Sequence, residues 1–155
     1  MTEVGFYHLT RSTLEHALPR LLEKAYAAGN RLLVRASDAE WLELLNRTLW
    51  TYGKESFLPH GTKADGFADQ QPIYLTVGTE NPNAATILVL VDGADAPDLA
   101  SFARCLELFD GGDPDAVERA RRRWREALEQ GHNTVYWQET ERGGWTNAAE
   151  RAATA

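Results

Sequence analysis

Hydrophobic positions near the start of the chain follow two alternating spacings. Residues 5–9 and 31–36 are short apolar runs of the kind that form buried strands. After each run, apolar residues recur every three or four positions, which is typical of an amphipathic helix. Polar residues suited to cap these helices precede them at positions 12–13 and 37–38. The order of strand, helix, strand and helix favours a parallel sheet that helices cover.

The second half of the chain continues this alternation after a break. Residues 51–71 contain glycines, a proline and little periodicity, so we expect a long loop there. Three further apolar runs predict strands, at residues 72–77, 86–91 and 104–109. The first two are joined by a connection too short for a helical crossover, so they are either antiparallel or not adjacent. A short helix is expected at residues 98–102, and residues 132–137 form a last strand or an irregular segment.

Length and composition indicate one intracellular domain. The 155 residues are enough for a single core, so we expect one α/β domain over residues 1–138 and a flexible tail over residues 139–155. The start of the chain lacks the pattern of a secretion signal, and no apolar run is long enough to span a bilayer. The single cysteine, Cys105, lies in an apolar stretch and reads as a buried small side chain. These features predict a cytoplasmic protein.

The net charge limits what the surface can bind. The chain has 16 Lys and Arg residues against 23 Asp and Glu residues, which gives a net charge of −7. Such a balance argues against broad binding of nucleic acid, although a local anion-binding patch remains compatible with it.

The motifs of the common catalytic and nucleotide-binding sites are absent from the sequence. It contains no GxxxxGK[ST], GxGxxG, GxSxG or HExxH, and its four histidines lack the spacing of metal ligands. We therefore expect no catalytic residue, no cofactor and no metal. The alternative is a small metal-dependent α/β enzyme, because Asp92 and Asp110 each follow a predicted strand and two carboxylates at strand ends can hold Mg²⁺. The simpler interpretation is that both Asp-Gly pairs are turns.

A long helix that begins after Asp113 and Pro114 and ends at Gly131 concentrates the positive charge. Five arginines fall within seven of its positions: Arg119, Arg121, Arg122, Arg123 and Arg125. Its apolar residues share one stripe: Val117, Ala120, Trp124, Ala127 and Leu128. Arg121 and Arg125 flank Trp124 at the edge of this stripe, an arrangement that suits a ligand with an anionic end and an apolar body.

Two other interpretations of this helix stay open. The arginines could form a solvated basic face that pairs with Glu118 and Glu126, with Trp124 as a core residue. They could also follow the phosphates of a nucleic acid, with Trp124 as a platform for a base.

The segment after the second helix carries apolar residues in a loop. Trp50 ends the predicted helix, and Phe57, Leu58 and Pro59 follow in the stretch ESFLPHG. Loops seldom contain such residues unless these fold onto the core or contact a partner, and the sequence favours neither.

Several of these stretches, taken in order, resemble a known family. They are FYHL, LW, ESFLPHG, the PI that starts a strand, LVLVDG, LELFDG and ARRRWREALEQGHNTVYWQ, and they extend from Gly5 to Trp137. Their order and spacing resemble the chi subunit of bacterial DNA polymerase III, a component of the clamp-loader complex. The resemblance implies a Rossmann-like α/β fold without a functional nucleotide-binding loop. It also implies an accessory subunit that is not itself an enzyme.

The resemblance further implies two partners and their sites. One is the acidic C-terminal tail of single-stranded-DNA-binding protein, at Arg121, Trp124 and Arg125, with Arg122 as a further source of positive charge. The other is the psi subunit, at a face formed by Trp50, Phe57, Leu58 and Pro59, for which a helicase could compete. Under this interpretation the protein reaches DNA only indirectly and has no membrane partner.

Overall fold

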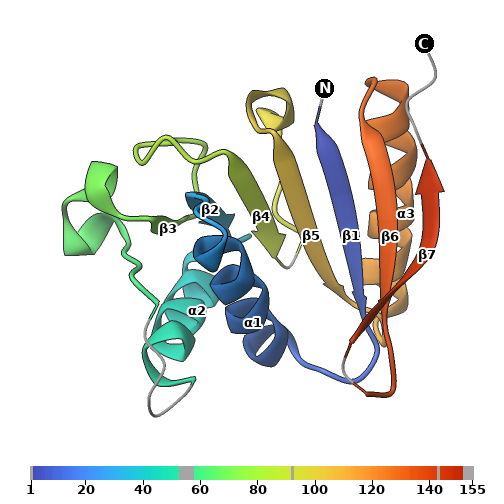
Figure 1. Cartoon of the computed structure of the whole chain (residues 1–155), viewed down its shortest axis with the longest axis horizontal. Coiled ribbons are helices and arrows are strands. Elements are labelled where there is room, and N and C mark those ends of the chain that lie inside the picture. The colour runs from blue at the N-terminus through green and yellow to red at the C-terminus, as the bar shows by residue number, and fades with distance from the viewer. Residues whose placement is uncertain (1, 53–57, 92, 143, 152–155) are drawn as a thin grey trace.

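The computed structural model describes residues 2–52, 58–91, 93–142 and 144–151, and within them one sheet of seven strands forms the centre of the molecule (Figure 1). The strands are β1 (Glu3–Leu9), β2 (Leu32–Arg35), β3 (Ile73–Thr76), β4 (Ile87–Val91), β5 (Arg104–Asp110), β6 (Asn133–Glu139) and β7 (Trp145–Arg151). They lie in the order β3-β2-β4-β5-β1-β6-β7, and all pairs but the last are parallel. The predicted fold class, a mainly parallel sheet flanked by helices, is confirmed.

In the described part of the chain three α-helices cover the sheet, and a capping residue precedes each of them. They are α1 (Leu14–Ala27), α2 (Ala39–Thr51) and α3 (Pro114–Glu129). The side chains of Thr13, Asp38 and Asp113 accept hydrogen bonds from backbone N–H groups of the first turns. Pro19 lies inside α1, where it is buried. There are also short 3₁₀ helices. Two of them, η1 (Lys63–Asp65) and η2 (Ala68–Gln70), lie within the expected long loop, and η3 (Leu99–Ser101) lies where the short helix was expected.

The relation between β3 and β4 resolves one alternative. The two strands do not pair with each other, because β2 lies between them and is parallel to both. The interpretation that they are not adjacent is therefore correct. The chain leaves β3 and crosses β2 without a helix, which brings β4 next to β5.

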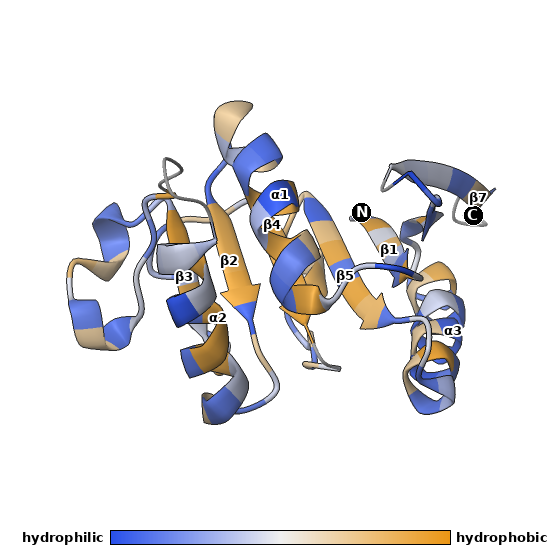
Figure 2. Ribbon diagram, turned by 90° about the horizontal axis from the view of Figure 1, so that it is seen from below, coloured by the Kyte–Doolittle hydropathy of each residue, from blue (hydrophilic) through white to orange (hydrophobic). Residues whose placement is uncertain are grey.

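The core consists of two layers, one on each face of the sheet. On one face, side chains such as Tyr7, Leu106 and Val89 pack with α1 and α2. On the other, Phe6, Cys105 and their neighbours pack against the alanines of α3. Figure 2 shows β2, β4 and β5 as mostly hydrophobic strands, β7 as a more polar edge, and α3 with mixed polar and apolar turns. Cys105 is fully buried, as expected, and burial raises the pKa of its thiol well above the ordinary value.

The C-terminal segment differs from the expected flexible tail. β6 continues the sheet beside β1, and β7 pairs with β6 in antiparallel orientation from Glu139↔Trp145 to Thr134↔Arg151. The physical reason is that Trp145 packs edge-on against Tyr7, with ring centroids 5.1 Å apart, so the segment buries an aromatic side chain. The ordered sheet thus extends beyond residue 138, and residues 152–155 lie outside the described part. None of the described helices has the length and apolar content that a membrane-spanning helix requires.

Candidate functional site

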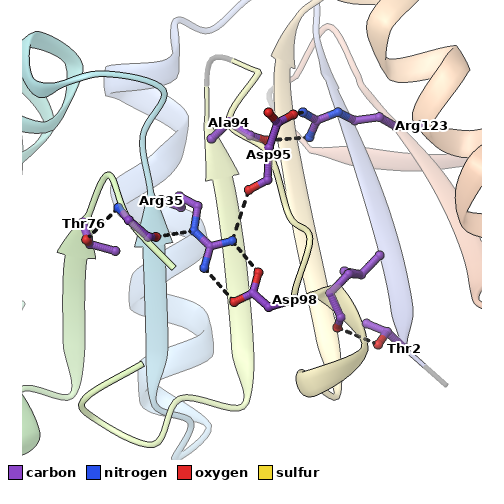
Figure 3. A network of polar contacts seen from close by, with 9 residues as sticks. Thr2, Arg35, Thr76, Ala94, Asp95, Asp98 and Arg123 are labelled. Carbon is purple, nitrogen blue, oxygen red and sulfur yellow. Dashed lines mark hydrogen bonds and ion pairs between the residues drawn. The ribbon is translucent and has the colours of Figure 1, made fainter. Parts of the chain in front are cut away.

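Among the arginines of α3, Arg123 points inward. Its guanidinium donates to the carbonyl oxygens of Ala94 at 2.6 Å and Gly93 at 3.0 Å (Figure 3). It also forms ion pairs with Asp95 at 2.9 Å and with Glu107 of β5 at 3.1 Å. Arg123 therefore fixes α3 to the loop after β4 and to the sheet, and its charge is already satisfied.

The carboxylate that Arg123 meets is buried. Glu107 is 5% exposed, and burial raises its pKa to about 7 although the ion pair with Arg123 lowers it. Burial outweighs the ion pair because transfer of a carboxylate from water to an apolar interior is costly. The Arg123–Glu107 pair is thus a structural contact between α3 and the sheet.

Arg121 and Arg125 have a different environment, on the outer side of α3. Both are exposed, and both line a surface concavity of about 460 Å³ together with Gly111, Pro114, Val117 and Glu118. Within the described part of the chain, neither arginine forms an ion pair. The alternative in which Glu118 and Glu126 neutralise this face is therefore not what the structure contains. Two guanidinium groups one helical turn apart can bind a carboxylate that enters this concavity.

Trp124 lies behind this concavity rather than in its wall. Its half-buried ring packs between Phe6, at a centroid distance of 5.5 Å, and Tyr136, at 6.0 Å. Tyr136 in turn contacts the rings of His8 and Phe109. The structure thus brings Arg121 and Arg125 together, while Trp124 supports them through an aromatic cluster.

Sequence reasoning missed the other members of this cluster. Tyr136 and His8 share a hydrogen bond between the Tyr136 hydroxyl and His8 Nδ1. Their positions follow from the pairing of β6 with β1, which places Tyr136 opposite Phe6. Strand periodicity gives the side on which each residue points, but the neighbour of each strand is not visible in one sequence.

Electrostatics connects Arg121 to this cluster. Burial lowers the pKa of His8, the Arg121 charge lowers it further, and Asp110 raises it. Burial raises the pKa of Tyr136, and Arg121 opposes that rise. The positive charge of Arg121 therefore acts on the aromatic cluster, so an anion bound at Arg121 would raise the pKa of His8.

The two remaining arginines of α3 lie to either side of this pair. Arg122 is exposed and forms no ion pair with any described residue. Arg119 lies near Gly93 and lines a different concavity, of about 520 Å³, at the carboxyl ends of β1 and β5. Arg122 is thus exposed, and its role as additional positive charge for a ligand stays a prediction, whereas Arg119 faces another part of the surface.

The second predicted face divides between surface and core. The Trp50 side chain is 54% exposed, and its ring lies 4.9 Å from that of His60. Pro59 is half-buried, but Leu58 is only 1% exposed and belongs to the core below α1 and α2. Phe57 lies outside the described residues. Leu58 is therefore a core residue, whereas Trp50 and Pro59 remain accessible to solvent.

One exposed aromatic near this loop was not singled out in the sequence. Phe67 is 72% exposed at the start of η2, with a left-handed backbone conformation. The signal that drew attention to Phe57, an aromatic residue in a glycine-containing loop, applies equally to Phe67 in the stretch DGFAD.

The strand ends considered for an enzyme give no support to that alternative. The exposed Asp110 carboxylate accepts a hydrogen bond from the backbone N–H of Gly112 at 2.8 Å, which is the contact of a turn. Asp92 lies outside the described residues. Among the residues that the structure describes, no three His, Cys, Asp or Glu side chains are grouped so as to hold a metal ion.

Comparison with known proteins assigns the chain to a family. The family model described as DNA polymerase III chi subunit, HolC, matches residues 1–135. A probable DNA polymerase III subunit chi of Rickettsia prowazekii is 33% identical over 109 residues, which are 70% of this chain and 66%, just under two thirds, of that protein. The DNA polymerase III subunit chi of Pseudomonas aeruginosa is 28% identical over 136 residues, which are 85% of this chain and 93% of that protein. The resemblance seen in the sequence is thereby confirmed, and the chain belongs to the DNA polymerase III chi subunit family.

Proposed function

We propose that this protein is an accessory subunit of the replicase that binds the acidic C-terminal tail of single-stranded-DNA-binding protein at the outer side of α3. Membership of the chi subunit family implies a role in replication. The observation that supports the tail as ligand is the pair Arg121 and Arg125, exposed at one concavity and without an ion pair among the described residues. In this proposal the protein binds and does not catalyse.

The chemistry of the concavity fits the end of an acidic peptide. A terminal carboxylate takes both guanidinium groups, because Arg donates through a planar fork that matches the two carboxylate oxygens. The apolar side chains of Val117 and Pro114 line the same space and accept an apolar tail residue. Arg122 attracts the acidic residues that precede the peptide's C-terminus, and salt weakens this attraction because both charges are exposed.

A second proposed contact, with the clamp loader, lies at the end of α2, away from α3. We propose that the psi subunit, or a helicase competing for the same face, contacts the surface around Trp50 and Pro59, with Phe57 included as a sequence-based expectation. The exposure of Trp50 supports this assignment, since a large apolar side chain in solvent is a common anchor of protein interfaces. Leu58, which is part of the core, would support this surface from below rather than contact the partner.

The tail-binding proposal is tested by titration with a fluorescent peptide that copies the C-terminal tail of the host's single-stranded-DNA-binding protein. We expect a Kd of about micromolar order, because a short flexible peptide loses conformational entropy when it binds. The variant Arg121→Ala should weaken binding at least about tenfold, since a charged hydrogen bond contributes about 1.5–3 kcal/mol. Higher salt should weaken the wild-type complex.

A matched control separates this site from general charge. Arg47→Ala removes one exposed positive charge from α2 and should leave peptide binding within about twofold of wild type. Equal loss in Arg47→Ala and Arg121→Ala would mean that the peptide senses only overall charge. No binding at about millimolar peptide would rule out the tail as the ligand of α3.

A further inference from the structure

The sheet face opposite α3 carries a second aromatic cluster, which lies beside α1 rather than directly under any helix of the described part. α1 and α2 lie toward the β2 and β4 side of this face, whereas α3 lies behind β1 and β6 (Figure 1). Between α1 and the β6–β7 hairpin is a concavity of about 220 Å³, whose wall contains Tyr7, Trp137 and Trp145. The Tyr7 ring stacks near Trp137 at 6.3 Å and 18°, and meets Trp145 edge-on at 5.1 Å. Both tryptophans are half-buried, so parts of their rings remain in contact with solvent.

Gly5 helps to shape this concavity. A Cβ atom at Gly5 would lie 3.0 Å from Cε1 of Tyr7 and 3.6 Å from the Trp137 ring. The missing side chain therefore lets the two rings lie close to the strand. The result is an aromatic surface that faces α1 across a gap.

Basic side chains border this concavity and a second one, of about 530 Å³, at the start of α1. Lys24 and Arg104 line the first, and Arg11, His16, Arg20 and Arg142 line the second. All six are exposed, and none forms an ion pair with a described residue. In a protein of net charge −7, the five Lys and Arg residues of this border are a local concentration of positive charge.

Three of these basic residues form a row along α1. His16, Arg20 and Lys24 follow one another at intervals of four residues, which is about 6 Å of helix length per interval. The two acidic residues that line the second concavity are Glu139 and Glu141. The buried Glu139 carboxylate accepts hydrogen bonds from the N–H groups of Thr10, Arg11 and Ser12, and together with the exposed Glu141 it offsets part of the positive charge of this border.

We infer that this groove between α1 and the β6–β7 hairpin binds single-stranded nucleic acid. The phosphates of the bound strand lie along the basic row on α1, and one or two of its bases stack against Trp145 and Trp137. Binding sites for single strands combine a positive groove with aromatic rings, and the stacking tolerates any base. An acidic peptide could also bind the basic row. Its acidic residues carry no aromatic ring, however, whereas every nucleotide carries a base that can stack on the tryptophans.

The C-terminal hairpin is what completes the groove. The family model ends at residue 135, so both tryptophans come from the part of the chain beyond that match. β7 places Trp145 against Tyr7, and the hairpin contributes Arg142 to the basic border. The groove therefore adds direct contact with a strand to the indirect contact that the proposed tail binding would give.

The test is fluorescence anisotropy of a labelled oligothymidine of about twelve nucleotides, at about 50 mM salt. The double variant Arg20→Glu and Lys24→Glu should weaken binding about tenfold or more. Trp145→Ala should weaken it about fivefold or more, and Trp145→Phe should restore most of the affinity, because a phenyl ring still stacks. The matched control, Arg121→Ala with Arg125→Ala on α3, should stay within about twofold of wild type.

Three outcomes would overturn the inference. The first is no binding at about millimolar protein, and the second is a loss confined to the α3 double variant, which would move the strand to the arginine helix. The third is equal affinity for a polyglutamate peptide of similar length, which would show that the groove recognises charge alone. The charge-reversal variant changes two exposed helix positions, so it keeps the test valid even if Trp145→Ala unfolds the hairpin.

Discussion

The two faces of the sheet near β1 and β6 use the same strands in different ways. Phe6 and Tyr136 point toward α3, whereas their neighbours Tyr7 and Trp137 point toward α1. Each face therefore has an aromatic cluster bordered by basic residues on a helix. On one face α3 packs directly over the cluster, whereas on the other the edge strand β7 supplies the third ring and leaves a groove.

The difference lies in how the charge is held. On the α3 face a buried ion pair, Arg123 with Glu107, fixes the helix, and the exposed Arg121 and Arg125 are carried on a rigid support. On the opposite face the basic side chains that border the groove are all exposed, and they come from α1, from β5, from the hairpin and from the segment before α1. The first arrangement favours a specific, oriented anion, and the second favours a flexible polymer whose charges are screened by salt.

The largest effect is expected where the support of the α3 face is removed. Arg123→Ala leaves Glu107 buried without its cation and removes the hydrogen bonds to the carbonyls of Gly93 and Ala94. Breaking one side of a buried pair is expected to lower the free energy of unfolding by about 3–5 kcal/mol. Urea unfolding followed by circular dichroism measures the loss.

Arg122→Ala is the matched control, because it removes a neighbouring arginine that is exposed and unpaired among the described residues. Its free energy of unfolding should lie within about 0.5 kcal/mol of wild type. Similar losses in both variants would mean that helix propensity, and not the buried pair, sets the stability of α3.

The two tryptophans give a direct comparison of the faces. Trp124→Ala removes a ring that packs between Phe6 and Tyr136 under a helix, and we expect a loss of about 3 kcal/mol. Trp145→Ala removes a ring from an edge strand, where the groove already admits water, so about 1 kcal/mol is expected. Thermal unfolding of the two variants ranks them, and a larger loss for Trp145 would show that β7 is part of the main cooperative unit.

Glu107 gives the α3 face a dependence on pH. Its ordinary pKa of 4.5 applies to the unfolded chain, and burial raises the folded value to about 7. The folded state thus favours the protonated form, so its contribution to stability is complete below pH 4.5 and disappears as the pH rises through about 7. As the pH rises from 5 to 8, the free energy of unfolding of wild type should therefore fall by about 1–3 kcal/mol relative to that of Glu107→Gln.

Urea unfolding at the two pH values tests this, with Glu118→Gln as the control at an exposed position of α3. A wild-type stability that does not fall between pH 5 and pH 8 relative to Glu107→Gln would mean that Arg123 keeps the carboxylate ionised in the folded protein.

The sequence predicted the elements well because their signals are local. Hydrophobic period, a capping residue and the Asp113–Pro114 start were enough to place α3, and the alternation of strands and helices was enough for the parallel sheet. The position of β2 between β3 and β4 was left open, because strand order depends on long-range packing. β7 was missed because its alanines and polar residues carry a weak strand pattern, and its one strong contact, between Trp145 and Tyr7, joins residues far apart in the chain.

The candidate site divides in the same manner. Helical spacing placed Arg121 and Arg125 on one side of α3, but it could not tell that Arg123 turns inward, since Glu107 comes from a different strand. The same limit applies to His8 and Tyr136, which become neighbours of Trp124 only through the pairing of β1 with β6. Contacts within one helix are readable from spacing, whereas contacts between elements need the strand order first.

The smallest expected effect reports whether an anion occupies Arg121. The pKa of His8 is lowered by burial and then by Arg121, so a peptide carboxylate bound at Arg121 should cancel part of that lowering and raise the pKa of His8. By linkage, the peptide then binds slightly more tightly as the pH falls through the titration of His8. An NMR titration of the His8 ring protons with and without peptide measures the shift. His132, whose pKa is lowered by burial and by the chain N-terminus, is the internal control and should not change. A shift at both histidines would indicate a general effect of the peptide, and a shift at His8 alone would locate the anion beside the aromatic cluster of α3.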